Sequence, residues 1–239
     1  MQKIVKYSFY FGIFICLFAI ILILTTNAYL KPSLPKVKLV DEAELQMPLK
    51  VYTKDGILIG EFGEIKRRPT TFTEIPENIK NAFLAAEDDN FFNHQGISYT
   101  GLIRSFIRCL RPSGCEGGGG TITMQVVRGY LLTREQTVIR KIKEIFLALE
   151  LEGNLEKEEI FELYVNRIFL GNRSYGIEAA ANTYFDKNIK ELSISESATI
   201  AALAQLPSRV NPVKDPRRTK LRRNWILSRM LLLGYIDQI

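Results

Sequence analysis

The chain has 239 residues, with 32 lysines and arginines against 26 aspartates and glutamates, so its formal net charge is +6. This moderate excess suits an anionic partner such as a phosphate or an acidic lipid, and no zinc-ligand spacing, basic heptad region or aromatic RNA-binding signature indicates a nucleic-acid-binding protein. Three cysteines are too few for a disulfide scaffold, and one histidine excludes a histidine metal cluster.

An uncharged stretch lies near the N-terminus, at residues 7–30. Its centre is almost wholly apolar and long enough to span a bilayer, which takes about 20 residues. A cleaved signal peptide, the alternative, has an apolar core of only about 7–15 residues and a small-residue cleavage site. We therefore expect residues 1–30 to form a cytoplasmic stub and one transmembrane helix, with the rest of the chain outside the cytoplasm.

The next segment, residues 31–45, contains two prolines and mixed charge and is predicted to be a linker. A domain covering residues 46–239 follows. At its start, two apolar runs flank Lys54-Asp55-Gly56. Asp-Gly between such runs is a strong signal for a β-hairpin.

The stretch after Pro76 carries the strongest chemical signal. Proline suits the first position of a helix, and helical spacing then places Ile79 and Phe83 on one face. The helix is expected to end near Glu87, which therefore lies beside the buried side. A carboxylate half out of water has a raised pKa and can accept or donate a proton. The alternative is a solvated acidic helix end anchored by Phe91.

Residues 97–110 form an apolar stretch that also contains arginines, which predicts an amphipathic helix. Such a helix either packs on the core or dips into the lipid interface with its arginines at headgroup level. The glycines at 117–120 predict a mobile backbone that can approach a ligand closely. We expect residues 97–120 to be a mobile, membrane-proximal subregion, followed by polar side chains at Thr121, Thr123, Gln125 and Arg128.

The clearest helix is predicted over residues 134–152. Arg140 and Glu144 lie one turn apart on it, where an ion pair would contribute only a few tenths of a kcal/mol. They lie off the predicted apolar stripe, which consists of Val138, Ile142, Ile145 and Leu149.

Further helices are predicted toward the C-terminus, at about residues 156–169, 193–206 and 217–233. The capping box of Ser193 and Glu196 marks the start of the second of these. The fold class is therefore mainly α with one small hairpin, and neither a doubly wound α/β domain nor a sandwich.

Five short motifs now follow in an order that resembles one family, the peptidoglycan glycosyltransferases (glycosyltransferase family 51), a transglycosylase domain also found in class A penicillin-binding proteins. The resemblance covers roughly residues 45–239, and five motifs in order make it specific. The second motif departs at Gly120, Met124 and Arg128, where the family usually has Ser, Gln and Lys. The motifs are Glu87-Asp88-x-x-Phe91-x-x-His94-x-Gly96, residues 120–128, Arg140-Lys141-x-x-Glu144, Glu162-x-Tyr164-x-Asn166 and the segment from Ala201 to Pro212.

The resemblance implies a lysozyme-like helical glycosyltransferase domain, either monofunctional or cut from a longer protein with a transpeptidase half. Its substrate would be lipid II, a disaccharide-pentapeptide on undecaprenyl pyrophosphate, joined to a growing glycan strand with inversion. The location implied is the outer side of a bacterial cytoplasmic membrane. The implied partners are lipid II, the glycan strand, the lipid bilayer and other cell-wall synthesis and division proteins, with no nucleic acid.

The chemistry of that reaction suggests roles for the motif residues. Glu87 would be the general base that takes the proton of the acceptor hydroxyl. Glu144, the second catalytic carboxylate, would face Glu87 across one cleft and either hold nearby cations or bind a divalent cation such as Mg²⁺. No organic cofactor is implied. The residues expected to bind the pyrophosphate or substrate are Arg128, Arg140, Lys141, Thr121, Thr123 and Gln125. The supporting residues would be Asp88, Phe91, His94, Gly96, Glu162 and Asn166.

Two other functions remain as alternatives. A lysozyme-like glycan hydrolase or lytic transglycosylase would need one catalytic glutamate but no phosphate-binding cations. An inactive membrane-anchored scaffold is favoured only by the altered second motif. Separately, Cys109 and Cys115 are close enough in the sequence to form a disulfide outside the cytoplasm, and two unpaired thiols are the alternative.

Overall fold

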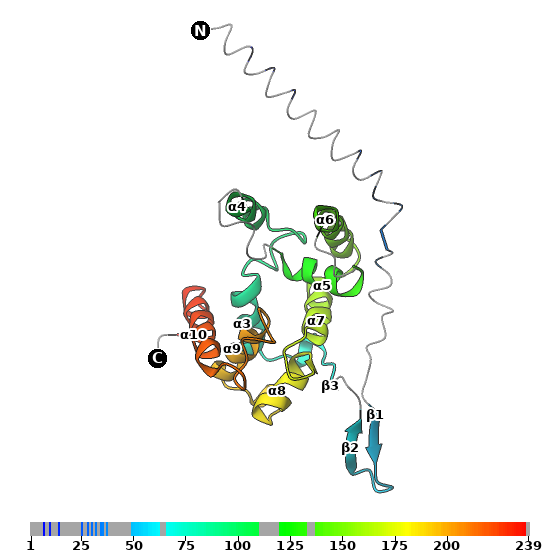
Figure 1. Cartoon of the computed structure of the whole chain (residues 1–239), viewed down its shortest axis with the longest axis vertical. Helices are drawn as coiled ribbons and strands as arrows, with labels where there is room; N and C mark the ends of the chain where they lie inside the picture. Colours follow the sequence, from blue (N-terminus) through cyan, green and yellow to red (C-terminus); the bar gives the residue numbers. More distant parts are fainter. Residues whose placement is uncertain are drawn as a thin grey trace.

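A mainly helical body and a small β-hairpin that extends away from it make up the part of the molecule labelled in Figure 1. This computed structural model describes residues 49–62, 66–109, 120–132 and 137–237, with single positions between residues 7 and 37. Within that part of the chain no helix is long and apolar enough to cross a membrane. The expected transmembrane span, most of the expected linker and the side chains of Cys109 and Cys115 lie outside it.

The predicted hairpin is confirmed. Strand β1 (Leu49–Tyr52) pairs antiparallel with β2 (Leu58–Phe62). In the turn, the backbone N–H of Thr53 donates to the carbonyl of Ile57 at 2.8 Å. Gly56 has a φ of +81°, which glycine adopts without a Cβ penalty. The Asp-Gly signal therefore identified the turn correctly.

Most of the expected helices are present, with ends shifted by a few residues. Pro76 is the N-cap of the first of them rather than its first helical residue. The helices of the described residues are α3 (Glu77–Glu87), α4 (Tyr99–Cys109), α5 (Ile122–Tyr130), α6 (Val138–Glu152), α7 (Lys157–Arg167), α8 (Ile177–Phe185), α9 (Ile194–Leu203) and α10 (Pro216–Leu232), with short 3-10 helices η2 (Phe72–Glu74) and η3 (Ile189–Glu191). Two-residue strands β3 (Lys66–Arg67) and β4 (Ser174–Tyr175) pair in parallel.

Helix α9 lies at the centre of the core. Every residue from Ser197 to Leu203 is buried, and the helix packs against α3 and α10 (Figure 1). Ala198, Ala201 and Ala202 are small enough to let neighbouring helices approach closely. The predicted capping box at its start is present, with the backbone N–H of Ser193 donating to the Glu196 carboxylate at 2.8 Å.

Helix α5 is not among the helices predicted from the sequence, since the glycines before it indicated only a mobile backbone. It begins at the N-cap Thr121, whose hydroxyl accepts the backbone N–H of Met124 at 3.1 Å. An N-cap of this kind satisfies one of the free N–H groups at a helix start. Helix α5 packs against both α6 and α7, so it connects the segments that carry the motifs.

The predicted apolar stripe of α6 is only partly correct, because Ile145 packs against the core but two other positions are exposed. Val138 is 77% exposed and Leu149 is 41% exposed. The buried residues of α6 are instead Glu144, Leu147, Ala148 and Leu151. Apolar residues occur around much of this helix. The helical period of the sequence was therefore compatible with burial of either of two faces. Packing against α5 selected the face that carries Glu144, and it left part of the predicted stripe on the outside.

Gly96 lies where the segment after α3 crosses α6. Its φ is +77°, and a Cβ added there would lie 2.8 Å from the carbonyl oxygen of Ala148. We expect Gly96→Ala to lower the free energy of unfolding by more than the roughly 1–3 kcal/mol of backbone strain alone, because the backbone of α6 must also shift. Gly234→Ala is the matched control, since Gly234 has a φ of +73° but nothing within 4 Å. Equal losses in thermal unfolding would show that the crossing is not tight.

Candidate functional site

Glu87 is the last residue of α3 and is half-buried. The side-chain amide of Gln125, on α5, donates to its carboxylate at 2.9 Å. Burial raises the pKa of Glu87, while this hydrogen bond and the charges of Arg222 and Arg128 lower it and the charge of Asp88 adds to the rise. The Glu87 carboxylate is therefore fixed by a hydrogen bond and has a higher pKa than an exposed glutamate. Both properties suit a general base.

Asp88 connects this carboxylate to the start of α5. Its side chain is buried and accepts the backbone N–H of Ile122 at 3.0 Å and His94 Nε2–H at 2.9 Å. A carboxylate at a helix N-terminus is stabilised by the free N–H groups and the helix dipole. His94 and Asp88 therefore hold the turn after Glu87 in place, as the supporting roles expected from the sequence require.

The two threonines expected to bind substrate are used inside the protein. Thr121 and Thr123 are both buried. Thr121 donates to the carbonyl of Gly96 at 2.6 Å, and Thr123 donates to the carboxylate of Glu152 at 2.5 Å. Their hydroxyls join α5 to the first motif and to α6. We therefore assign them to the support of the site instead of to direct contact with substrate.

Glu144 is fully buried on the inner face of α6. Its carboxylate accepts hydrogen bonds from Arg140 Nη1 and, at 3.0 Å, from Lys141 Nζ. Both of its oxygens are thus occupied by cations, and the side chain does not face open solvent. The expectation that Glu144 opens onto a cleft shared with Glu87 does not fit this burial. Its position suits an anchor for the two cations.

The cations lie on α5 and α6, with Arg128 in the last turn of α5 and Lys141 near its start. A Cβ added to Gly120 would lie 3.7 Å from Lys141 Nζ, so this amine reaches the residue before the N-cap. Burial, together with repulsion from Arg128 and Arg140, lowers the pKa of Lys141 to about 8. Arg128 and Arg140 therefore both act electrostatically on Lys141. Two of these cations, Arg140 and Lys141, share the Glu144 carboxylate, and with Arg128 beside them positive charge remains for an anion such as a phosphate.

A metal held by the protein does not fit these residues. Among the described residues no group of three or more histidine, cysteine, aspartate or glutamate side chains could hold a metal ion. The one carboxylate expected to bind Mg²⁺, Glu144, has both oxygens in ion pairs. We therefore derive no step that uses a protein-bound metal.

The remaining supporting residues stabilise the fold through core packing and hydrogen bonds to the backbone. Phe91 is fully buried, and Lys157 Nζ lies 4.5 Å from the centre of its ring. Asn166 holds the segment before η2 through two hydrogen bonds with the backbone of Thr70, at 2.8 and 2.9 Å. Glu162 accepts the backbone N–H of Phe72 at 2.7 Å. These contacts are structural and reach neither Glu87 nor the cations.

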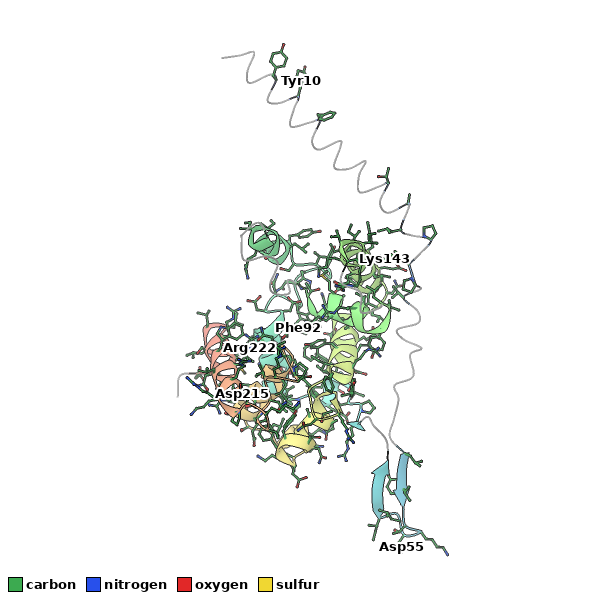
Figure 2. The ribbon with its side chains drawn as sticks, in the orientation of Figure 1. Tyr10, Asp55, Phe92, Lys143, Asp215 and Arg222 are labelled. Carbon is green, nitrogen blue, oxygen red and sulfur yellow. The ribbon has the colours of Figure 1, made fainter. Side chains whose placement is uncertain are left out.

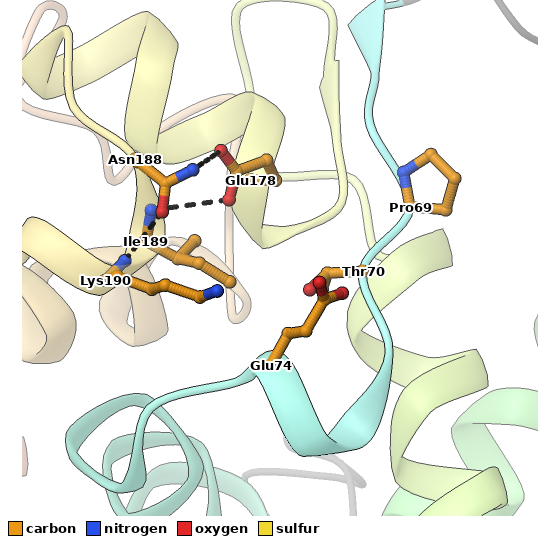
Figure 3. Close-up of a pocket in the computed structure, with 7 residues that line it drawn as sticks. All are labelled: Pro69, Thr70, Glu74, Glu178, Asn188, Ile189 and Lys190. Atoms are coloured by element: carbon orange, nitrogen blue, oxygen red, sulfur yellow. Dashed lines mark hydrogen bonds between the residues drawn. The ribbon is translucent and has the colours of Figure 1, made fainter.

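A polar pocket of about 240 Å³ lies away from this site, between η2 and η3 (Figure 3). In Figure 3, Glu178 turns toward Asn188 and Ile189 instead of into open space. Its carboxylate accepts the Asn188 side-chain N–H at 2.9 Å and the backbone N–H of Ile189 at 3.3 Å. Because that carboxylate fastens η3 to α8, the pocket has no group arranged for the chemistry considered above.

The structure adds two residues to which the sequence assigned no role. Arg222, on α10, acts electrostatically on Glu87. Tyr164, on α7, is buried, and its hydroxyl has no hydrogen-bond partner among the residues that the structure describes. Burial, and then the charge of Glu87, raises the pKa of Tyr164 well above its ordinary value. The only sequence signal for Arg222 was its helical spacing from the apolar Ile226.

The sequence matches the family described as Transglycosylase over residues 55–231. Penicillin-binding protein 1A of Pseudomonas aeruginosa is 55% identical over 210 residues, which cover 88% of this chain and 26% of the relative. Penicillin-binding protein 1A of Escherichia coli (strain K12) is 42% identical over 237 residues, 99% of this chain and 28% of the relative. A crystal structure of Penicillin-Binding Protein 1A from Haemophilus influenzae has a TM-score of 0.45 and 34% identity, and the match covers 82% of this chain and 20% of that one.

The chain therefore spans about a quarter of the length of the curated relatives it matches. The family match itself extends over most of the chain, from the turn of the β-hairpin to near the end of α10. It includes Glu87, the cations and every helix that positions them. On this evidence the chain belongs to the transglycosylase family.

Proposed function

We propose that this domain polymerises lipid II into the glycan strands of peptidoglycan and releases undecaprenyl pyrophosphate. The observation that supports this most is the arrangement along α5. Gln125 binds the carboxylate of Glu87, and Arg128, one turn later, belongs to the same group of charges as Arg140 and Lys141. This arrangement supports a base for a sugar hydroxyl and a pyrophosphate site that share one helix.

In the proposed mechanism, ionised Glu87 accepts the proton of the acceptor sugar's 4-hydroxyl. The hydroxyl oxygen attacks the donor's anomeric carbon from the side opposite the pyrophosphate and forms the new glycosidic bond. The bond from that carbon to the phosphate oxygen breaks, and its electron pair leaves with the pyrophosphate. Arg128, Arg140 and Lys141 stabilise the charge that develops there. The attack inverts the centre, so no covalent enzyme intermediate is required.

Exposed apolar side chains support a location at the surface of a membrane. On α4, Tyr99, Ile103 and Ile107 are exposed at intervals of four residues, and Val138 and Ile139 are exposed at the start of α6. Figure 1 shows α4 and α6 at the end of the body opposite the hairpin. An apolar face beside basic residues suits the boundary between headgroups and acyl chains. A lipid-linked substrate would be met there, on the outer side of the cytoplasmic membrane.

Polymerisation can be tested directly with the purified chain in detergent or in liposomes. We expect it to convert lipid II into glycan strands with release of undecaprenyl pyrophosphate, and to leave finished glycan uncut. Cleavage of finished glycan without polymerisation would favour the hydrolase or lytic transglycosylase. Neither activity, in a folded protein that still binds other cell-wall synthesis proteins, would favour the scaffold.

The charge on Lys141 predicts a pH dependence of anion binding. With a pKa of about 8, Lys141 is charged below pH 8 and loses its proton above it, although the Glu144 carboxylate at 3.0 Å and any bound anion oppose that loss. We expect the affinity of the free protein for inorganic pyrophosphate to fall by up to about tenfold between pH 8 and 9.

Lys141→Arg is the matched control, because arginine stays charged over this pH range. The ionisation of pyrophosphate itself affects both proteins equally, so the difference between them reports the charge at position 141. Titration calorimetry at several pH values gives the comparison. Parallel pH profiles for the two proteins would contradict the prediction, because they would show that loss of the Lys141 charge does not control anion binding in this range.

A further inference from the structure

Helix α10 packs against α3, which ends at Glu87, and carries two arginines on one side. Arg222 and Arg229 are seven residues apart, two helical turns, and so lie on the same side of the helix. That side adjoins the buried residues Ile226 and Met230, and α10 packs against α3. Arg229 Nη2 donates to the carboxylate of Asp89, two residues after Glu87. This ion pair holds the helix against the turn.

Arg222 lies against a neighbouring aromatic ring. Its guanidinium lies 4.0 Å from the centre of the Trp225 ring, a cation–π contact one turn along the helix. The side chain is half-buried, and its Nε is buried without a hydrogen-bond partner in the described part of the chain. In Figure 2 the labelled Arg222 lies on the side of α10 that faces α3. Arg222 is therefore not a fully solvated surface charge, because it is half-buried on the helix that packs against α3.

We infer that Arg222 is a positioning residue for Glu87, holding its carboxylate in the ionised, hydrogen-bonded form in which it accepts a proton. This inference rests on the proposed function. Within the described residues, Gln125 of α5 binds the Glu87 carboxylate, and Arg128 of α5, Arg222 of α10 and the adjacent Asp88 act on it electrostatically, while its charge acts in turn on Tyr164 of α7.

The two cations near Glu87 differ in what they do when substrate binds. In the proposed mechanism Arg128 is neutralised by the pyrophosphate. Arg222 lies on α10, outside the group of cations on α5 and α6, and its charge stays available. It therefore opposes the effect of burial on Glu87 at the moment when the proton is transferred.

The test compares Arg222→Met with Arg222→Lys, and uses Arg223→Met as the control. Arg223 is the neighbouring cation on α10, and its guanidinium binds the side-chain oxygen of Asn224 at 2.7 and 3.0 Å. One readout is kcat/KM for lipid II polymerisation as a function of pH. The other, which needs no activity, is the titration of the Glu87 carboxyl by ¹³C NMR, assigned by the loss of its signal in Glu87→Gln.

We expect Arg222→Met to move the acidic limb of the profile and the Glu87 titration to higher pH, because the proton is held more tightly without the cation. Activity then falls several-fold on the acidic limb and recovers on the alkaline plateau. Arg222→Lys should restore most of the shift, and Arg223→Met should match the wild type.

A uniform loss at every pH with an unchanged Glu87 titration would overturn the inference and leave Arg222 a structural residue. Thermal unfolding of each variant shows whether Arg222→Met is folded, and Arg222→Lys carries the test if it is not. If the wild-type chain fails to polymerise lipid II, the proposed function is wrong, and the NMR titration alone then decides whether Arg222 acts on Glu87.

Discussion

Glu87→Gln is expected to abolish the polymerisation of lipid II while leaving the fold and lipid II binding largely intact. Glutamine keeps the size of the side chain and can still accept the N–H of Gln125 through its own oxygen, but it cannot take a proton from a sugar hydroxyl. Loss of a general base typically lowers the rate by about 10²–10⁴-fold. Turnover of lipid II, measured with thermal unfolding of the same samples, gives the result.

The control for this change is Glu77→Gln, at the other end of α3. Glu77 is exposed, and its partner among the residues that the structure describes is Lys80, at 2.9 Å. Its replacement removes the same charge from the same helix without approaching the site, so activity should stay near the wild-type level. Retention of more than about a tenth of wild-type turnover by Glu87→Gln would be inconsistent with general-base loss and would end the assignment.

The second large effect is expected from Glu144→Gln. This change removes a fully buried carboxylate and leaves Arg140 and Lys141 facing each other without a counterion. Breaking a buried ion pair costs about 3–5 kcal/mol. We expect the lower end of that range, because the Lys141 side chain is 36% exposed and can regain some water. The free energy of unfolding and the affinity for lipid pyrophosphate should both fall.

These two losses separate an anchoring role from a catalytic one. If Glu144 instead took part in proton transfer, kcat would fall while stability and anion binding stayed unchanged. Glu150→Gln, an exposed position on the same helix, is the matched control and should leave both properties intact. Restoration of full activity to Glu144→Gln by added Mg²⁺ would instead favour the metal alternative.

Much of the local structure and the position of Glu87 at a helix end were predictable from the sequence. The Asp-Gly turn, the Ser193 capping box and the placement of Glu87 at the end of an apolar helix depend on residues only a few positions apart. The order of five motifs was sufficient to identify the family. Each of these signals acts through backbone geometry or short helical spacing, so it does not require knowledge of distant contacts.

The tertiary structure decided the parts that depend on contacts between distant segments. The buried face of α6 was chosen by packing against α5, which turned Glu144 inward. The hydroxyls of Thr121 and Thr123 were taken by the Gly96 carbonyl and by Glu152, and Arg222 was brought from α10 to the end of α3. A helix with apolar residues on several sides has more than one face that could be buried, and a cation on a basic helix has no local signal for its partner. Only the packing of the whole domain selects among these possibilities, because burial energy depends on what lies opposite each side chain.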